Sequence, residues 1–378
     1  MGREPLGAMK TQRSTMPRVY LDHAATTPMA AAAIDAMVAA MRIVGNPSSV
    51  HAGGRSAFAI VEDARDTIAR WAGVVADAVV FTSGGTEAIA LAMRGSAGAT
   101  RSSSMDRALA SAVEHSAVLQ SRDDIMTVAV DDDGVIDCHV LEAMLKQGAG
   151  IVAVQQVNNE TGVIQPLADV AACVSAHGGL LMVDAVQAAG KMALAQADFV
   201  AISAHKLGGP PGVGALIVRD PGTLRAVQRG GGQERGLRGG TPNLPGIAGF
   251  AAAVLQTYNS GAVAGLRKQL EQRLLAVPGT VINGAGAPRA PHISSITLPG
   301  VPGGTQVMAM DMAGFMVSAG AACSSGKVAA SHVLAAMGVP AGDAIRVSLG
   351  PDTAQGDIDA FVAAWLAMAA RLGQGGLS

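Results

Sequence analysis

The chain has 378 residues, enough for about two domains. Hydrophobic residues make up 49% and charged residues 15%, which allows a large buried core and excludes a disordered chain. The 27 basic and 29 acidic residues leave a net charge of -2 without a basic run, so we expect no nucleic-acid partner. No apolar run has the roughly 20 residues of a membrane span, and the three cysteines are widely spaced. We therefore expect a cytoplasmic protein without membrane contact.

Short β-rich runs alternate with helical stretches over about 200 residues, the pattern of a parallel sheet covered on both faces. Strands are predicted at residues 78–82, 151–157, 180–184 and 199–203. Before them, apolar residues recur at the helical period and predict a packing helix, at Phe58, Val61, Ala64, Ile68 and Trp71.

The pattern changes near residue 258, which places a domain boundary there. A long amphipathic stretch follows from Val263 and stops at Pro278. Shorter strands at 294–298 and 315–318 and a terminal helix from Ile358 to Leu372 predict a smaller α/β domain. We predict a large domain at 24–258 and a small one at 1–23 and 259–378.

Residues 81–88, FTSGGTEA, follow an apolar strand and lead into a helical run. Backbone N–H groups and a hydroxyl at a helix N-terminus form a site for phosphate. The same residues also fit a glycine turn with Thr86 as the helix N-cap. Taken alone, this stretch leaves both interpretations open.

Two charged side chains follow the next predicted strands. Asp184 ends the strand at 180–184, at the sheet edge where ligands of open α/β folds collect, although an isolated Asp there also suits a loop anchor. Lys206 follows the strand at 199–203, where a lone lysine is commonly a solvated charge. An amine for an aldehyde, a carboxylate for a ring nitrogen and a phosphate turn are together the requirements of pyridoxal 5'-phosphate. Their combination indicates that cofactor.

At these residues the sequence resembles the cysteine desulfurases, in the class V branch of the aminotransferase-like pyridoxal phosphate enzymes. The matching blocks are YLDHAATTP at 20–28, GNPSSVH at 45–51, FTSGGTEA at 81–88, EH at 114–115, NNETG at 158–162, DAVQ at 184–187, SAHKLGGP at 203–210, ERGLRGGT at 234–241, SAGAACSSG at 318–326 and IRVSLG at 345–350. The resemblance implies an aminotransferase-like α/β fold, with a mostly parallel seven-stranded sheet in the large domain. It also implies L-cysteine as substrate, a homodimer, and a sulfur-acceptor protein such as an iron–sulfur scaffold.

The resemblance further implies roles around the cofactor. Lys206 resembles the lysine that forms an imine with it, and Asp184 resembles the partner of its ring nitrogen. His115 resembles the imidazole stacked on the ring, a candidate proton carrier. Gln187 and Asn159 resemble contacts to the ring oxygen, although Asn159 also suits a turn.

Further residues match the parts of the family's site that hold phosphate and substrate. Those matching the phosphate site are Gly85, Thr86, Ser203 and His205, with Thr241 reaching it across a dimer interface. Arg346, together with Asn159, resembles the site for the substrate carboxylate, which a guanidinium binds in a planar bidentate way. A structural ion pair is the alternative for Arg346.

Cys323 lies among small residues, which suits an exposed thiol, whereas Cys138 and Cys173 suit core positions. The resemblance implies that the Cys323 thiolate attacks the sulfur of the substrate, leaving alanine and a persulfide on the enzyme. Rival hypotheses are a selenocysteine lyase or another class V β-eliminating enzyme, and a non-catalytic sulfur-carrier scaffold. Gln233 stands at a position where many members of the family have histidine. The sequence does not explain the effect of this difference.

Overall fold

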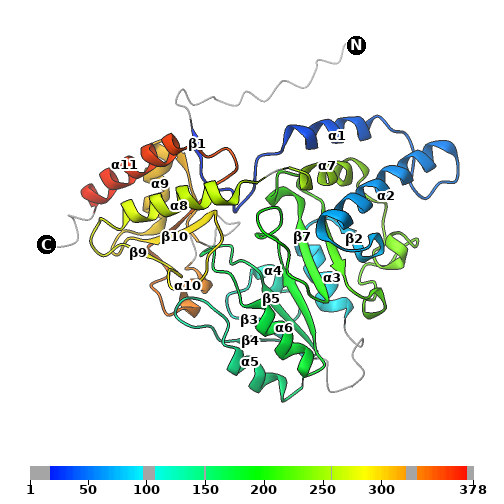
Figure 1. Ribbon diagram of the computed structural model, residues 1–378, viewed down its shortest axis with the longest axis horizontal. Coiled ribbons are helices and arrows are strands. Elements are labelled where there is room, and N and C mark those ends of the chain that lie inside the picture. Colours follow the sequence, from blue (N-terminus) through cyan, green and yellow to red (C-terminus); the bar gives the residue numbers. More distant parts are fainter. Residues whose placement is uncertain (1–17, 97–106, 149, 257, 321–329, 373–378) are drawn as a thin grey trace, which may run out of the picture.

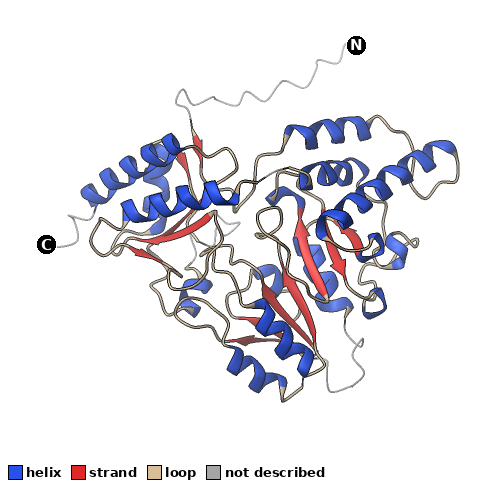
Figure 2. Ribbon diagram, in the orientation of Figure 1, coloured by secondary structure: helices blue, strands red, loops and turns tan. Residues whose placement is uncertain are grey.

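The computed structural model describes residues 18–96, 107–148, 150–256, 258–320 and 330–372. Its elements form two groups of strands and helices, one labelled around β7 and the other around β10 (Figure 1). In both groups helices pack against the strands (Figure 2). None of the helices within these ranges is long and apolar enough to cross a membrane.

The larger group is built on a seven-stranded sheet. Its strands lie in the order β2 (Val79–Thr82), β8 (Gly214–Val218), β7 (Phe199–Ser203), β6 (Leu180–Asp184), β5 (Ile151–Gln155), β3 (Ala108–Ser111) and β4 (Ile125–Val128). β8 runs antiparallel to β2 and β7, and the remaining neighbours are parallel. The predicted α/β fold with a mostly parallel seven-stranded sheet is confirmed.

Successive residues of the central strands face two different cores. Val200 and Ile202 of β7 face one core, and Phe199 and Ala201 face the other. Every residue of β5, β7 and β8 is buried, because helices cover both faces and no side of these strands needs to be polar.

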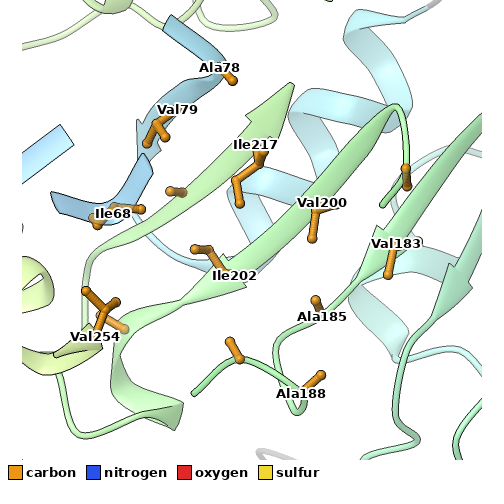
Figure 3. Packing of buried hydrophobic residues seen from close by; sticks show 14 of the residues in the cluster. Ile68, Ala78, Val79, Val183, Ala185, Ala188, Val200, Ile202, Ile217 and Val254 are labelled. Atoms are coloured by element: carbon orange, nitrogen blue, oxygen red, sulfur yellow. The ribbon is translucent and has the colours of Figure 1, made fainter. Parts of the chain in front are cut away.

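The helices on the two faces differ. The first core takes residues from α2 (Ala52–Ala72), α5 (Cys138–Leu145), α6 (Leu167–Ala176) and α7 (Leu244–Val254). Figure 3 shows Ile68 of α2 and Val254 of α7 close to the side chains of β7 and β8. The second core takes residues from α3 (Gly85–Gly95) and α4 (Ser116–Leu119). α1 (Ala31–Met41) packs on α7.

The smaller group joins the two ends of the chain. β1 (Val19–Tyr20) pairs in parallel with β11 (Phe315–Met316), and β12 (Ala344–Ser348), β10 (Ile293–Thr297) and β9 (Val281–Ile282) form an antiparallel sheet. Its helices are α8 (Ser260–Leu274), α9 (Gly303–Met312), α10 (His332–Ala336) and α11 (Gln355–Leu372). Trp365, Phe361 and Leu270 fill a separate core that also contains Leu21. The division at 24–258 against 1–23 and 259–378 stays a prediction, which the separate cores support.

The predicted elements agree with the structure more closely in their centres than at their ends. The predicted strand at 151–157 ends at Gln155, and the strand at 315–318 ends at Met316. The placement of Phe58 on the packed face of α2 was wrong, since its side chain is 52% exposed. The inward face is already filled by Ala57 and Val61, and Phe58 lies at its edge beside a surface cavity.

Candidate active site

The carboxyl ends of β2, β6 and β7 lie at one edge of the large sheet. Ser203 ends β7 and Thr82 ends β2, and both are in register with Gly214. Asp184 ends β6 beside Gln155 of β5. Ligands of open α/β sheets bind outside the carboxyl ends of the strands, so this edge is where a site is expected.

Lys206 lies at this edge, in the short 3₁₀ helix that follows β7. Its amine donates hydrogen bonds to the carbonyl oxygens of Ala24 (2.7 Å) and Ala25 (2.6 Å). Burial, and next the nearby charge of Arg346, lower the pKa of the Lys206 amine to about 8. A substantial fraction of this amine is therefore uncharged in mildly alkaline solution, as a nucleophilic amine requires.

Asp184 is a buried carboxylate without a cation on it. Its Oδ1 accepts a hydrogen bond from the Val186 N–H (2.9 Å), and no lysine or arginine in the described ranges forms an ion pair with it. Burial raises the pKa of Asp184 despite the opposing charges of His115 and Lys206. Nearby, Gln187 donates to the Ala24 carbonyl (2.8 Å), while its Oε1 is buried without a partner.

His115 caps α4 through its ring. Its Nδ1 accepts from the Ala117 N–H (3.1 Å), so the neutral ring carries its proton on Nε2. Burial lowers the pKa of His115. The preceding Glu114 is fully buried and accepts from the Gln155 N–H (2.8 Å), and burial raises its pKa well above the usual range.

The turn between β2 and α3 packs closely against Val186 and Ser203. A Cβ on Gly85 would lie 2.8 Å from the Val186 side chain and 3.5 Å from Ser203, so only glycine fits without displacement. Gly84 has φ 153, a conformation that favours glycine. The buried Ser203 therefore lies against the N-terminus of α3, whereas Thr86 in its first turn is exposed.

His205 and Thr241 are two further candidate residues for a phosphate site. The His205 Nδ1 lies 3.2 Å from the Thr26 hydroxyl, and burial and the Lys206 charge lower the pKa of His205 to about 4. Thr241 is exposed and lines a cavity of about 70 Å³ with Ser83. Gln233 accepts from the Gly240 N–H (3.0 Å), so its side chain holds the residue before Thr241.

Arg346 on β12 reaches the site from the smaller group. It is buried, and donates to Asp22 Oδ1 (2.8 Å) and to the Asn159 carbonyl (2.9 Å), leaving its Nε without a partner. The ion pair considered as an alternative for Arg346 is thus present, with Asp22. The turn at 158–162 is organised by Asn158, which accepts from the N–H groups of Glu160 and Thr161. The turn therefore does not require the Asn159 side chain.

Cys323, the predicted nucleophile, lies outside the described residues, but both flanks of 321–329 contact the site. Ser318 exchanges two backbone hydrogen bonds with Arg346 (3.1 and 2.7 Å). On the other flank, the Ser331 hydroxyl lies 2.5 Å from Glu160 Oε2, and His332 Nε2 lies 2.8 Å from the Glu114 carbonyl. Each flank is therefore tied to a segment that carries a candidate site residue.

The sequence interpretation missed Lys191 as a site residue. Its side chain is buried, and its amine donates to the backbone carbonyl of Lys206 (2.8 Å). The one available signal was a single lysine among small and apolar residues between β6 and β7. Within the described ranges, no group of three His, Cys, Asp or Glu residues could hold a metal ion.

The chain is similar to known proteins over nearly its whole length. A cysteine desulfurase of Cereibacter sphaeroides is 40% identical, covering 91% of this chain and 94% of that protein. An IscS-like cysteine desulfurase of Mycobacterium tuberculosis is 38% identical, covering 90% and 93%. Among solved structures, a NifS-like protein with 31% identity superimposes with a TM-score of 0.85, covering 94% of this chain and all of the other. Residues 19–361 match the Aminotransferase class-V family, and the chain belongs to that family.

Proposed function

We propose that the protein is a pyridoxal phosphate-dependent cysteine desulfurase that takes sulfur from L-cysteine and releases L-alanine. The observation that carries this proposal is the convergence of Lys206, Asp184 and the Gly85 turn at one edge of the sheet. The class V family depends on pyridoxal 5'-phosphate, and relatives named cysteine desulfurase align over about nine-tenths of the chain. We infer that the sulfur passes to an acceptor protein, such as an iron–sulfur scaffold.

The residues at this edge fit the cofactor. The buried Gln187 Oε1 lacks a donor, the Asp184 carboxylate forms no ion pair in the described ranges, and glycine at 85 lets the N-terminus of α3 lie close to Ser203. Asp184 would face the protonated ring nitrogen, Gln187 the ring oxygen and Lys206 the aldehyde carbon. The phosphate would be held by Gly85, Thr86, Ser203 and His205. When bound, pyridoxal 5'-phosphate supplies an aldehyde for the substrate amine and a ring that accepts electron density.

Arg346 would orient the substrate. Its guanidinium already holds Asp22, and its Nε has no partner, so a substrate carboxylate shares or replaces the contact with Asp22. Asn159 is fixed beside it through its backbone carbonyl. The substrate is thereby oriented between the two groups of elements that form the fold.

The protons and the sulfur would be moved by three side chains. Lys206, with its lowered pKa, removes the α-proton of the substrate, and His115 holds a transferable proton on Nε2. The Cys323 thiolate attacks the substrate sulfur, forming an S–S bond while the bond from carbon to sulfur breaks. The electron pair stays with the carbon, which is protonated to give alanine, and the persulfide remains on Cys323.

We also propose that the active form is a homodimer. Thr241 is exposed in the single chain, as expected of a residue that completes the phosphate site of a second copy. Gln233 supports the turn that presents it. Light scattering of the purified protein measures the mass, and a monomer that is fully active would contradict this part of the proposal.

The decisive experiment measures sulfide and alanine produced from L-cysteine by the purified protein supplied with pyridoxal 5'-phosphate. Cys323→Ala should retain cofactor absorbance and lose sulfide release, while Cys138→Ala serves as the matched control. Full activity of Cys323→Ala would overturn the role of the thiol. Turnover of selenocysteine alone would instead support a selenocysteine lyase, and a protein that binds no cofactor would support a scaffold.

A further inference from the structure

Lys191 is a buried residue that contacts both the backbone of Lys206 and the start of α8. Its side chain is 6% exposed, and its amine donates to the Lys206 carbonyl oxygen (2.8 Å). Its own carbonyl oxygen accepts from the Ser260 hydroxyl (2.5 Å). Ser260 is the first residue of α8, so one residue contacts both the peptide of Lys206 and the start of the smaller group.

The other anchors of Lys206 come from the N-terminal segment. Its amine lies on the carbonyls of Ala24 and Ala25, and its own carbonyl also accepts from the Thr27 hydroxyl (3.1 Å). Among the described contacts, Lys191 is the side chain from outside that segment that holds the Lys206 carbonyl. Without it, the Lys206 carbonyl oxygen would keep only the Thr27 hydroxyl as a side-chain donor among the described contacts.

The surroundings of Lys191 explain why this contact is maintained. Lys191 lines a cavity of about 50 Å³ with Tyr258, and no carboxylate in the described ranges pairs with it. Burial, and next the charge of Lys206, lower the pKa of Lys191 to about 7. The ionisable groups that face the two amines are Asp22, His23, His115, Asp184, His205, His292 and Arg346. The Lys206 carbonyl is therefore the partner that compensates the buried amine of Lys191.

We propose that Lys191 is a positioning residue that fixes the peptide of Lys206 relative to the first turn of α8. The inference rests on the proposed role of Lys206 toward the cofactor. Because Lys191 holds the backbone, the Lys206 side chain keeps one direction whether its amine is free or bound. Movement of α8 is also transmitted to Lys206 through Ser260.

The test follows covalent capture of pyridoxal 5'-phosphate, by absorbance, after the cofactor has been removed from the full-length protein. Lys191→Met keeps the aliphatic stem and loses the donor, so capture should be about tenfold slower. Lys268→Met, at an exposed position of α8, should capture at the wild-type rate. Deuterium exchange of the peptide 203–209 should rise in Lys191→Met and stay unchanged in Lys268→Met.

The pH profile of capture tests whether residue 191 lies beside the Lys206 amine. Lys191 is largely uncharged where Lys206 titrates, so Lys191→Met should keep the wild-type midpoint near 8. Lys191→Arg places a permanent charge beside Lys206 and should lower the midpoint by about one pH unit. An unshifted midpoint in Lys191→Arg would show that residue 191 does not face Lys206.

Ser260→Ala tests the connection to α8 and covers the case in which Lys191→Met does not fold. It should slow capture about threefold and raise exchange in both 203–209 and 258–266. Wild-type capture rates in Lys191→Met and Ser260→Ala, with an unshifted midpoint in Lys191→Arg, would overturn the inference. If the wild-type chain captures no cofactor, the proposed function fails instead, so the two failures are distinguishable.

Discussion

Glu271 and Asp184 are both buried carboxylates, but within the described ranges only Glu271 forms ion pairs. Arg267 donates to Glu271 at 2.8 Å and Arg289 at 2.6 Å, inside the smaller group. Burial acts to raise the pKa of Glu271, but the hydrogen bonds and charges of the two arginines outweigh it and lower that pKa. At Asp184 burial prevails and the pKa is raised.

The difference distinguishes a structural cluster from a binding site. A buried charge needs compensation, and around Glu271 the protein supplies it. Around Asp184 the described chain offers one backbone donor, and burial outweighs it together with the charges of His115 and Lys206, which leaves the remaining compensation to a ligand. A buried carboxylate without an ion pair at a sheet edge therefore distinguishes the candidate site from a structural cluster. Substitutions at Asp184 and at Glu271 test the two halves of this comparison.

The largest effect is expected where the site loses its amine. Lys206→Ala should lower desulfurase turnover by about a thousandfold or more, because no other side chain can take both the covalent and the proton-transfer role. Turnover of L-cysteine and the cofactor absorbance measure this. Turnover within tenfold of wild type would show that Lys206 has no essential role in the mechanism. The sheet edge at Asp184 would then no longer be supported as the active site.

Removing the charge of Glu271 from its cluster with Arg267 and Arg289 should lower stability and have little effect on activity. Glu271→Gln leaves two buried arginines without a counter-charge and should lower the free energy of unfolding by about 3 kcal/mol. Since the pKa of Glu271 is lowered in the folded state, the difference should be present at neutral pH and shrink as acid protonates Glu271. Urea unfolding from pH 3 to 8 measures it, with Glu142→Gln, which removes a solvent-exposed ion pair with Lys146, as a control with a much smaller effect.

Neutralising Asp184 should increase stability, whereas neutralising Glu271 should decrease it. Asp184→Asn should raise the free energy of unfolding of the cofactor-free protein by about 1 to 2 kcal/mol, because a buried uncompensated charge is removed. Because the pKa of Asp184 is raised, this gain should appear above the usual carboxyl range and vanish in acid. Turnover should fall about a hundredfold. A loss of stability in the cofactor-free protein would show that Asp184 is compensated within the chain.

The smallest effect compares two helix caps. Ser331 caps α10 beside the site and Asp137 caps α5 far from it, and replacing either with Ala should cost about 1 kcal/mol of unfolding free energy. Turnover should fall severalfold only in Ser331→Ala, because that hydroxyl also holds Glu160 in the turn at 158–162. Equal turnover in the two variants would show that the contact of Ser331 with Glu160 does not affect the reaction.

The sequence predicted the parts of this site that local pattern controls. Asp184 and Lys206 follow uninterrupted apolar strands, and a strand end fixes its position at the sheet edge, so their placement could be foreseen. The burial of Lys191 could not, because a lysine among small residues resembles a solvated charge until distant segments pack over it. Likewise, the contact of Arg346 with Asp22 joins positions 324 residues apart, which no local signal encodes. Phe58 was misplaced because helical period does not say where a buried face ends.

The pairing of β1 with β11 determines when, during synthesis of the chain, the active site can form. The segment after β1 supplies Asp22 and the carbonyls that hold Lys206, and it is held in the smaller group by β11 and Arg346, which are made after the whole large sheet. A chain emerging from the ribosome can assemble the large sheet early, but the substrate pocket requires residues that precede it and residues that follow it. Nascent chains are therefore expected to stay inactive until β11 and β12 have been translated, which delays the release of reactive sulfur until both groups of elements have formed.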